Sequence, residues 1–315
     1  MKFEEFWNDE TLTLTSADEH DIRYFLPPPA LAPYINLFYI FRSQSDLIRD
    51  VQPASAGHVM FFLNGHGEVR FIDGIVQPSH EISLIGPSTS AMQYIVKGPI
   101  HFVAFTFNPA GYSALTRHKA AKGLNKLTNA TSVLGGGFAD ALTTIKALYA
   151  GGDNPDNDIK MVDALAAFLT GRFQPLKPNP AAAINMLFDA LEENLDIDLN
   201  DFYQGLPITQ RQMQRFCKDY LGSPPKYLIR KFRAVRAAML LGDRQCTQET
   251  REHVQNHFYD QSHMIREISL FSGRTPKYLS GDSTPLFKMW FDSANQTALT
   301  GIYAKTSKLA KPDRT

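Results

Sequence analysis

Two stretches decide the fold of this chain: TQRQMQRFCKDYLGSPPKYL at residues 209–228 and DQSHMIREISLFSGRTPKYL at residues 260–279. They repeat one pattern at an offset of 51 residues: a polar start, an amphipathic run that carries arginine, a glycine, and then Pro-Lys-Tyr-Leu. An internal repeat of a helical unit indicates a modular architecture, and two copies are too few for a solenoid. We therefore interpret residues 207–280 as paired helical modules.

The first module is predicted to be a helix-turn-helix. An amphipathic helix over residues 184–195 and a short element over 199–204 precede a tight turn at 205–207, and Thr209 is expected to cap the next helix. The apolar stripe of that helix consists of Met213, Phe216, Cys217 and Tyr220, and its outward side chains are Gln210, Arg211, Gln214 and Lys218. Such a helix fits the major groove of DNA, where Gln and Arg form paired hydrogen bonds with adenine and guanine.

The second module repeats this arrangement after a long bridging helix. The bridging helix is expected over residues 227–241 and has an apolar stripe that needs partners on both sides; its Arg230 is a further candidate DNA-binding residue. A helix over 248–256, a turn at 257–259 and a helix capped by Asp260 then follow. The residues expected to face out from this last helix are Gln261, Ser262, Ile265 and Arg266.

The charge pattern points to a polyanionic partner. The net charge of the 315 residues is zero, but residues 209–245 hold nine basic residues and two acidic ones. A neutral chain with a basic block favours one face that meets a polyanion, the alternative being a solvated helix face.

Residues 1–110 are predicted to be β-rich. Short apolar runs are separated by the turn signals Asn64-Gly65, Asp73-Gly74 and Gly98-Pro99, so we expect two hairpins around residues 59–72 and 92–107 in a small sandwich or barrel. The histidines of this region (His58, His66, His80 and His101) lack HxH spacing, so we predict no metal site. A small barrel can enclose a ligand cavity, whose lining the sequence does not specify.

Residues 111–173 are predicted to be helical, with two amphipathic helices whose apolar stripes are Phe138, Leu142, Ile145, Leu148 and Ile159, Val162, Leu165, Leu169. These helices either pack on the barrel or pair with a second copy, and we favour the dimer. Asp158 is a candidate cap for the second helix. The prolines of residues 174–181 predict a linker that resists helix and strand. The domains are thus 1–173, the linker 174–181, the DNA-binding domain 182–281, and a tail 282–315.

At the repeated stretches the chain resembles the AraC/XylS family of bacterial transcription regulators, and the match covers about residues 184–281. The resemblance implies an α+β protein: an N-terminal β-barrel, cupin-like domain with flanking helices, and an all-α domain of two helix-turn-helix units joined by a linker helix. It places base contacts at Arg211, Gln214, Arg215, Gln261, Ser262 and Arg266. Arg215 and Arg266 could equally hold a phosphate or an intramolecular carboxylate, and Gln210 and Lys218 suit phosphates or solvent.

This interpretation predicts a sequence-specific regulator that is not an enzyme and needs no cofactor. Its expected partners are double-stranded DNA at promoters or operators, a second copy in a homodimer, and an unidentified effector, and contact with RNA polymerase is compatible with it. The chain lacks a run of about 20 apolar residues and a CxxC motif, so we expect no membrane insertion and a cytoplasmic location.

Three alternatives remain open. DNA-alkyl repair would need a thiolate acceptor, and the chain has only Cys217 and Cys246. A cupin-type metalloenzyme would need the missing histidine cluster. A pure interaction protein with a degenerate DNA module would fit Tyr203, His253 and His257, which stand where the family has small residues.

Overall fold

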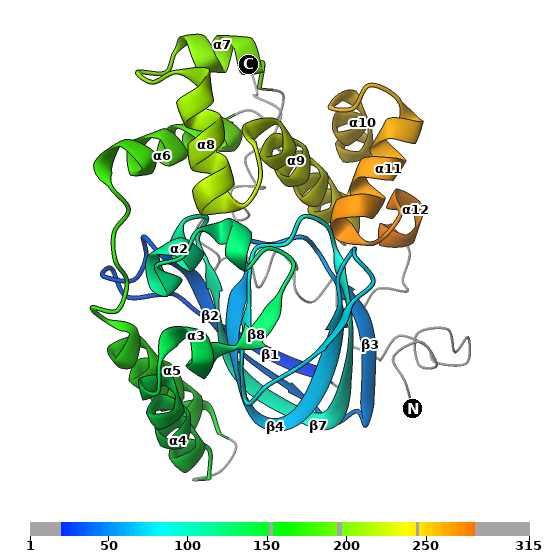
Figure 1. The fold of residues 1–315 in the computed structure, drawn as a ribbon. Coiled ribbons are helices and arrows are strands. Elements are labelled where there is room, and N and C mark those ends of the chain that lie inside the picture. Colours follow the sequence, from blue (N-terminus) through cyan, green and yellow to red (C-terminus); the bar gives the residue numbers. More distant parts are fainter. Residues whose placement is uncertain (1–19, 151–153, 194–196, 244–245, 281–315) are drawn as a thin grey trace.

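The computed structural model of the chain describes residues 20–150, 154–193, 197–243 and 246–280. An N-terminal β-barrel carries a group of C-terminal helices on one end, and further helices cover its outer side (Figure 1). The α+β fold class predicted from the sequence is confirmed. The tail expected at residues 282–315 lies outside the described residues.

The barrel is built from one antiparallel sheet that, in the described part of the chain, has eight strands. Its order is β1-β2-β7-β4-β6-β8, with β3 on β7 and β5 on β4. The strands are β1 (His20–Phe25), β2 (Ile35–Ser43), β3 (Leu47–Gln52), β4 (His58–Arg70), β5 (Val76–Pro78), β6 (Ile82–Ile85), β7 (Met92–Phe107) and β8 (Leu127–Asn129).

Both faces of the sheet are covered, which explains the continuous apolar sequence of β2. Successive side chains of a strand point to opposite faces. Phe38 and Ile40 join the core beneath the outer helices, whereas Tyr39 and Phe41 belong to a second cluster inside the barrel. The sheet therefore has one face for the helix-covered core and another for the barrel interior.

The prediction of hairpin turns at Asn64-Gly65 and Gly98-Pro99 is wrong. β4 and β7 each run straight through these dipeptides and pair with each other along their length, with register shifts next to Asn64. Gly65 has φ of +80°, a conformation that suits a β-bulge as well as a turn. The turn at Asp73-Gly74 does form, between β4 and β5.

The helices of the N-terminal part pack on the barrel. They are α2 (Gly111–Thr116), η2 (Ala120–Lys122), α3 (Ala130–Leu134), α4 (Gly137–Tyr149) and α5 (Pro155–Leu169). The stripes of α4 and α5 are largely buried in the chain's own core, including Phe138 and Leu165. The prediction that these stripes form a dimer interface is therefore wrong, because they are buried by internal packing. Among the large apolar side chains described on α5, Ile159 is the strongly exposed exception.

A buried carboxylate fixes α5 to the edge of the sheet. Asp158 is fully buried, and Arg23 of β1 donates to its Oδ2 at 2.5 Å. Arg42 of β2 binds both oxygens of the same carboxylate. The cap of α5 is Asn154, whose side chain accepts from the amide of Asn157, so the prediction that Asp158 caps this helix is wrong.

The C-terminal helices follow the sequence pattern closely. They are α6 (Pro178–Glu193), α7 (Leu199–Gln204), α8 (Gln210–Leu221), α9 (Pro225–Gly242), α10 (Gln248–Asn256), α11 (Gln261–Ser272) and α12 (Pro276–Leu279). Because α6 begins at Pro178, the end of the expected linker is helical, which fits the tolerance of the first helical turn for proline. α9 contributes Leu228 and Phe232 to one core cluster and Val235 and Met239 to the next, so it bridges the two units as predicted.

Candidate nucleic-acid interface and barrel cavity

The first candidate recognition helix, α8, is fixed at both ends by its own sequence. Thr209 and Gln212 form a reciprocal capping box at its start, which satisfies backbone donors that have no partner within the helix. Gly222 ends the helix with φ of +79°. Met213 and Cys217 are buried, whereas the outward side chains Gln210, Arg211, Arg215 and Lys218 are exposed.

The second candidate recognition helix, α11, has the same design. Asp260 accepts from the amide of His263 as the N-cap, and Gly273 ends the helix with φ of +75°. Met264, Ile268 and Phe271 face the core. The side chains expected to face out are all exposed: Gln261, Ser262, Ile265 and Arg266.

Both helices contact the barrel domain at the glycines that end them. A side chain at Gly222 would collide with Leu124, and one at Gly273 would collide with Val51. Tyr227, which follows the first glycine, donates its hydroxyl proton to the carbonyl of Thr89 at 2.7 Å. The N-terminal ends of α8 and α11, which carry Arg211 and Gln261, therefore lie away from the barrel (Figure 1).

Two predicted contact residues are engaged within the protein. Gln214 is half-buried and hydrogen-bonds with Tyr203 of α7; burial raises the pKa of Tyr203 against the opposing effect of this bond. Arg230 donates its Nε–H to Glu267 at 2.5 Å. Gln214 and Arg230 are therefore not among the predicted contact residues whose side chains are exposed to solvent.

Glu267 also ties α9 to α11. It is 2% exposed and accepts from Arg233 at 3.1 Å, with His263 at 3.2 Å from its other oxygen. Glu267 was not singled out by the sequence pattern. It lies six residues after Gln261 on the side of α11 that faces α9, and only the packing of the two helices reveals its role.

The basic block contains less exposed charge than its composition suggests. Lys231 and Arg236 of α9 are buried, and Arg233 is bound to Glu267. The exposed cations described in this block are Arg211, Arg215, Lys218 and Lys226. Three of these four lie on α8, which concentrates positive charge on the first candidate recognition helix.

Two of the histidines in the second unit, His253 and His257, form a local pair. Nε2 of His253 lies 3.1 Å from Nε2 of His257 at the end of α10. Val254 and Phe258 beside them are buried in the core of the unit. His253 and His257 are therefore accommodated at the edge of an otherwise packed helix pair.

Lys231 docks α9 onto the barrel without a carboxylate partner among the described contacts. Its Nζ lies 3.3 Å from the carbonyl of Ser88 and 3.4 Å from that of Ser55. The side chain is almost fully buried, and burial lowers the pKa of Lys231 to about 8. Docking of the helices on the barrel therefore encloses an amine that holds its proton less firmly than a lysine in water, although the charged form still dominates at neutral pH.

Replacing Lys231 with methionine should remove a pH-dependent component of stability. The folded pKa of about 8 lies below the unfolded value of 10.5, so the unfolded state binds more protons between these values and the free energy of unfolding rises with pH there. Urea unfolding at several pH values measures the effect. In this window the free energy of unfolding of the native chain should increase, relative to that of Lys231→Met, by up to roughly 1.4 kcal/mol per pH unit. Lys226→Met, at an exposed position of the same helix, is the control; a constant difference between Lys231→Met and the native chain would contradict the assignment.

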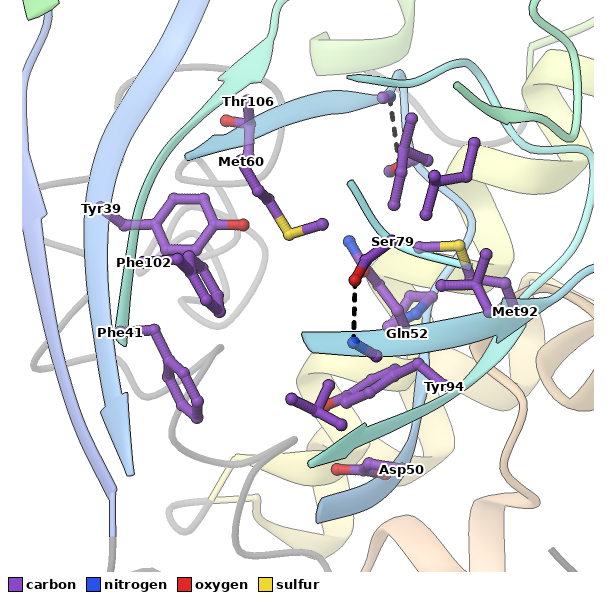
Figure 2. A pocket seen from close by; sticks show the side chains of 18 of the residues that line it. Tyr39, Phe41, Asp50, Gln52, Met60, Ser79, Met92, Tyr94, Phe102 and Thr106 are labelled. Atoms are coloured by element: carbon purple, nitrogen blue, oxygen red, sulfur yellow. Dashed lines mark hydrogen bonds between the residues drawn. The ribbon is translucent and has the colours of Figure 1, made fainter. Parts of the chain in front are cut away.

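The barrel encloses a cavity of about 190 Å³. Figure 2 shows Tyr39, Phe41, Phe102, Met60, Met92 and Tyr94 around it, with the Tyr39 hydroxyl directed inward. Burial raises the pKa of Tyr39 and of Tyr94, so both hydroxyls remain protonated. The sequence pattern does not reveal these residues, because alternate positions of distant strands supply them; the aromatic pair Tyr39 and Phe41 at alternate positions of β2 is the available signal.

One end of the cavity is shared with the second helix-turn-helix unit. Asp50 of β3 lines the cavity and forms an ion pair with Arg274, both side chains being 4% exposed. Burial raises the pKa of Asp50, against the opposing effects of Arg274 and the Val51 amide. Arg274 also donates to the carbonyl of Val51 at 2.8 Å, and the amide of Ala54 donates to the carbonyl of Phe271 at 2.8 Å. We name this group of contacts the β3 clamp.

The thiols offer no activated nucleophile. A thiolate is the reactive form of cysteine. Burial raises the pKa of Cys217 to about 12, and burial also raises the pKa of Cys246. Among the described residues, no cluster of three or more His, Cys, Asp and Glu side chains could hold a metal ion. No described helix is long and apolar enough to span a membrane.

Comparisons with known proteins give the following matches. Residues 23–129 match a family described as a domain of unknown function (DUF6597). A crystal structure of ToxT from Vibrio cholerae is similar with 10% identity and a TM-score of 0.43, over 82% of this chain and 97% of that chain. The AraC-like transcriptional activator CuxR is similar with 14% identity and a TM-score of 0.24, over 70% of this chain and 87% of that chain. No curated protein sequence matches the chain.

Proposed function

We propose that this chain is a sequence-specific DNA-binding transcription regulator of the AraC type, controlled by a small-molecule effector in the N-terminal barrel. The observation that carries the proposal is the matched exposure of two capped helices. Arg211 and Gln261 both lie in the first turn of their helices, α8 and α11, and both are exposed at the helix ends that lie away from the barrel (Figure 1). A helix presented in this way can enter the major groove with its N-terminal residues on the base edges.

The remaining site residues divide by chemistry. Arg211, Arg215, Gln261, Ser262 and Arg266 are proposed to read bases. Gln210 and Lys218 are proposed to bind phosphates, which supply affinity that falls with salt. Gln214 and Arg230 are proposed to position the recognition helices through Tyr203 and Glu267 rather than to contact DNA in the observed state.

Ile265 and the oligomeric state complete the proposal. Ile265 is 38% exposed among polar neighbours, and a branched apolar side chain there suits the methyl group of thymine. The regulator is proposed to act in the cytoplasm as a homodimer on promoter or operator DNA. Whether it contacts RNA polymerase is proposed to depend on the promoter that it regulates.

Selection of binding sequences from random duplex DNA by the purified full chain tests this function. We expect a defined sequence to emerge, and two copies of it in each selected duplex would support the dimer. Arg211→Ala and Gln261→Ala should each relax specificity at separate positions, by roughly ten- to hundredfold for a lost bidentate contact. Gel shift over a salt series measures both affinity and discrimination.

Matched controls lie on the supporting helix α10. Arg251→Ala and Gln255→Ala make the same chemical changes away from the proposed recognition faces and should leave the preference unchanged. Recovery of no sequence preference by the native chain, with equal salt-labile binding to every duplex, would overturn the proposed function. An unchanged preference in both recognition-helix variants would overturn the assignment of the reading residues.

A further inference from the structure

The chemistry of the cavity lining restricts the ligand. Its thirty lining residues, all in the described part of the chain, include no Lys, Arg or His. Seven are aromatic: Tyr24, Tyr39, Phe41, Phe62, Tyr94, Phe102 and Phe107. Nothing in the lining can neutralise an anion, while aromatic walls favour a flat ring that they can contact face-on or edge-on.

The size of the cavity sets the scale of the ligand. An apolar cavity of about 150 Å³ holds one benzene molecule. The 190 Å³ inside this barrel therefore suits a single aromatic ring with one or two small substituents. The Tyr39 hydroxyl, which points into the space in Figure 2, can hydrogen-bond with a polar substituent.

The charges at the edge of the cavity argue against an ionic ligand. Of the two acidic lining residues, Glu68 is exposed and Asp50 is already bound to Arg274. A carboxylate ligand would meet these acids without a cation, and an amine would have to displace a buried arginine. Taking either ion out of water without a partner is unfavourable.

We propose that the effector is an uncharged, single-ring aromatic compound, and that its binding acts on the second helix-turn-helix unit through the β3 clamp. This inference rests on the proposed function and names its ligand class and route. Asp50, Val51 and Gln52 line the cavity, and the first two hold Arg274. Val235 of α9 also lines it. A ligand in the cavity would therefore contact both β3, the barrel strand that binds Arg274 at the end of α11, and α9, the helix that joins the two units.

A matched set of compounds tests the ligand class on the protein alone. The set is p-cresol, p-toluate, benzylamine and 4-methylcyclohexanol, which differ in charge or aromaticity at similar size. We expect p-cresol to raise Tm by roughly 5–10 °C at a hundred times its Kd, with the other three binding at least tenfold more weakly by calorimetry. Equal or tighter binding of p-toluate or benzylamine, or no binding of p-cresol, would overturn the ligand class.

Substitutions in the cavity lining test whether p-cresol binds inside the barrel. Met60→Trp fills the cavity and should abolish p-cresol binding. Because the larger side chain could impair folding, Tyr39→Phe serves as a second variant that removes a single hydroxyl and should weaken binding roughly two- to tenfold. Tyr34→Phe makes the same change outside the cavity, where Tyr34 stacks on Phe173, and should bind normally. Native affinity in both cavity variants would move the site elsewhere and overturn the proposal.

The route is tested with the selected DNA. Saturating p-cresol should change the Kd for that DNA at least fivefold in the native chain, and this change should disappear in Arg274→Met. If p-cresol binds but alters DNA affinity equally in both proteins, or in neither, the β3 clamp is not the route. Ligand binding is measured without DNA, so failure of the ligand class leaves the DNA-binding function standing, and failure to select DNA leaves the ligand result interpretable.

Discussion

Replacing Asp158 with asparagine should lower the free energy of unfolding by about 3–5 kcal/mol, because it removes the buried carboxylate that neutralises Arg42, whose other acidic contact, Asp21, is exposed to solvent. Asp158 is fully buried, and Arg42, which binds both of its oxygens, is 8% exposed. Arg23 adds a third contact from the neighbouring strand. Urea unfolding at neutral pH measures the loss. Asp156→Asn, at an exposed position in the same first turn of α5, removes the same charge and should cost far less.

The same carboxylate should give the native chain an acid-sensitive component of stability. Burial acts to raise the pKa of Asp158, but hydrogen bonds and charges from Arg42 and Arg23 outweigh it and hold the pKa below its usual 3.8. A lowered folded pKa gives stability that is fully present above the unfolded value and is lost as the pH falls through the folded one. The gap between native chain and Asp158→Asn should therefore be constant above about pH 5 and narrow below pH 4. A gap that widens in acid would contradict the assignment.

Replacing Arg274 with methionine should release α11 from the barrel, at a cost of about 3–5 kcal/mol, because Asp50 is then left buried without a cation. The variant also loses the hydrogen bond to the Val51 carbonyl. Hydrogen exchange of the α11 amides and urea unfolding measure the two effects. Lys277→Met, at an exposed position three residues later, is the matched control.

The pH dependence of the Arg274 variant provides an internal check. Arg274 lowers the pKa of Asp50, which burial raises, so the variant raises that pKa further. A group with a raised folded pKa is stabilising below its unfolded value and loses that contribution as the pH rises. The deficit of Arg274→Met should thus be larger at pH 8 than at pH 5, and a deficit independent of pH would mean that Asp50 is not left charged.

Local signals in the sequence predicted the C-terminal helices well. Thr209, Asp260, Gly222 and Gly273 act within a few residues of themselves, as caps whose partners are neighbouring backbone groups. The same kind of signal failed at Asn64-Gly65, because a glycine with positive φ is needed equally by a turn and by a bulge. Only the pairing of β4 with β7 decides between them, and that pairing joins residues far apart in the chain.

Contacts across the domains were beyond the reach of the sequence pattern. Asp50 and Arg274 are 224 positions apart, and neither is unusual in its local surroundings. Asp158 resembled a helix cap because acidic residues are common in first turns, whereas its partners come from β1 and β2. The recognition-face residues could be assigned from helical periodicity, but Gln214 and Arg230 could not, since Tyr203 and Glu267 reach them from other helices.

The glycine ends of α8 and α11 make each proposed recognition helix a lever with its pivot on the barrel. Each helix has 12 residues and is therefore about 18 Å long. A tilt of roughly 10° at the pivot would displace the far end by about 3 Å, close to the rise of roughly 3.4 Å between successive base pairs. Under the proposed function, a tilt of this size would be enough to move Arg211 or Gln261, at the far ends of the helices, from one base pair to the next.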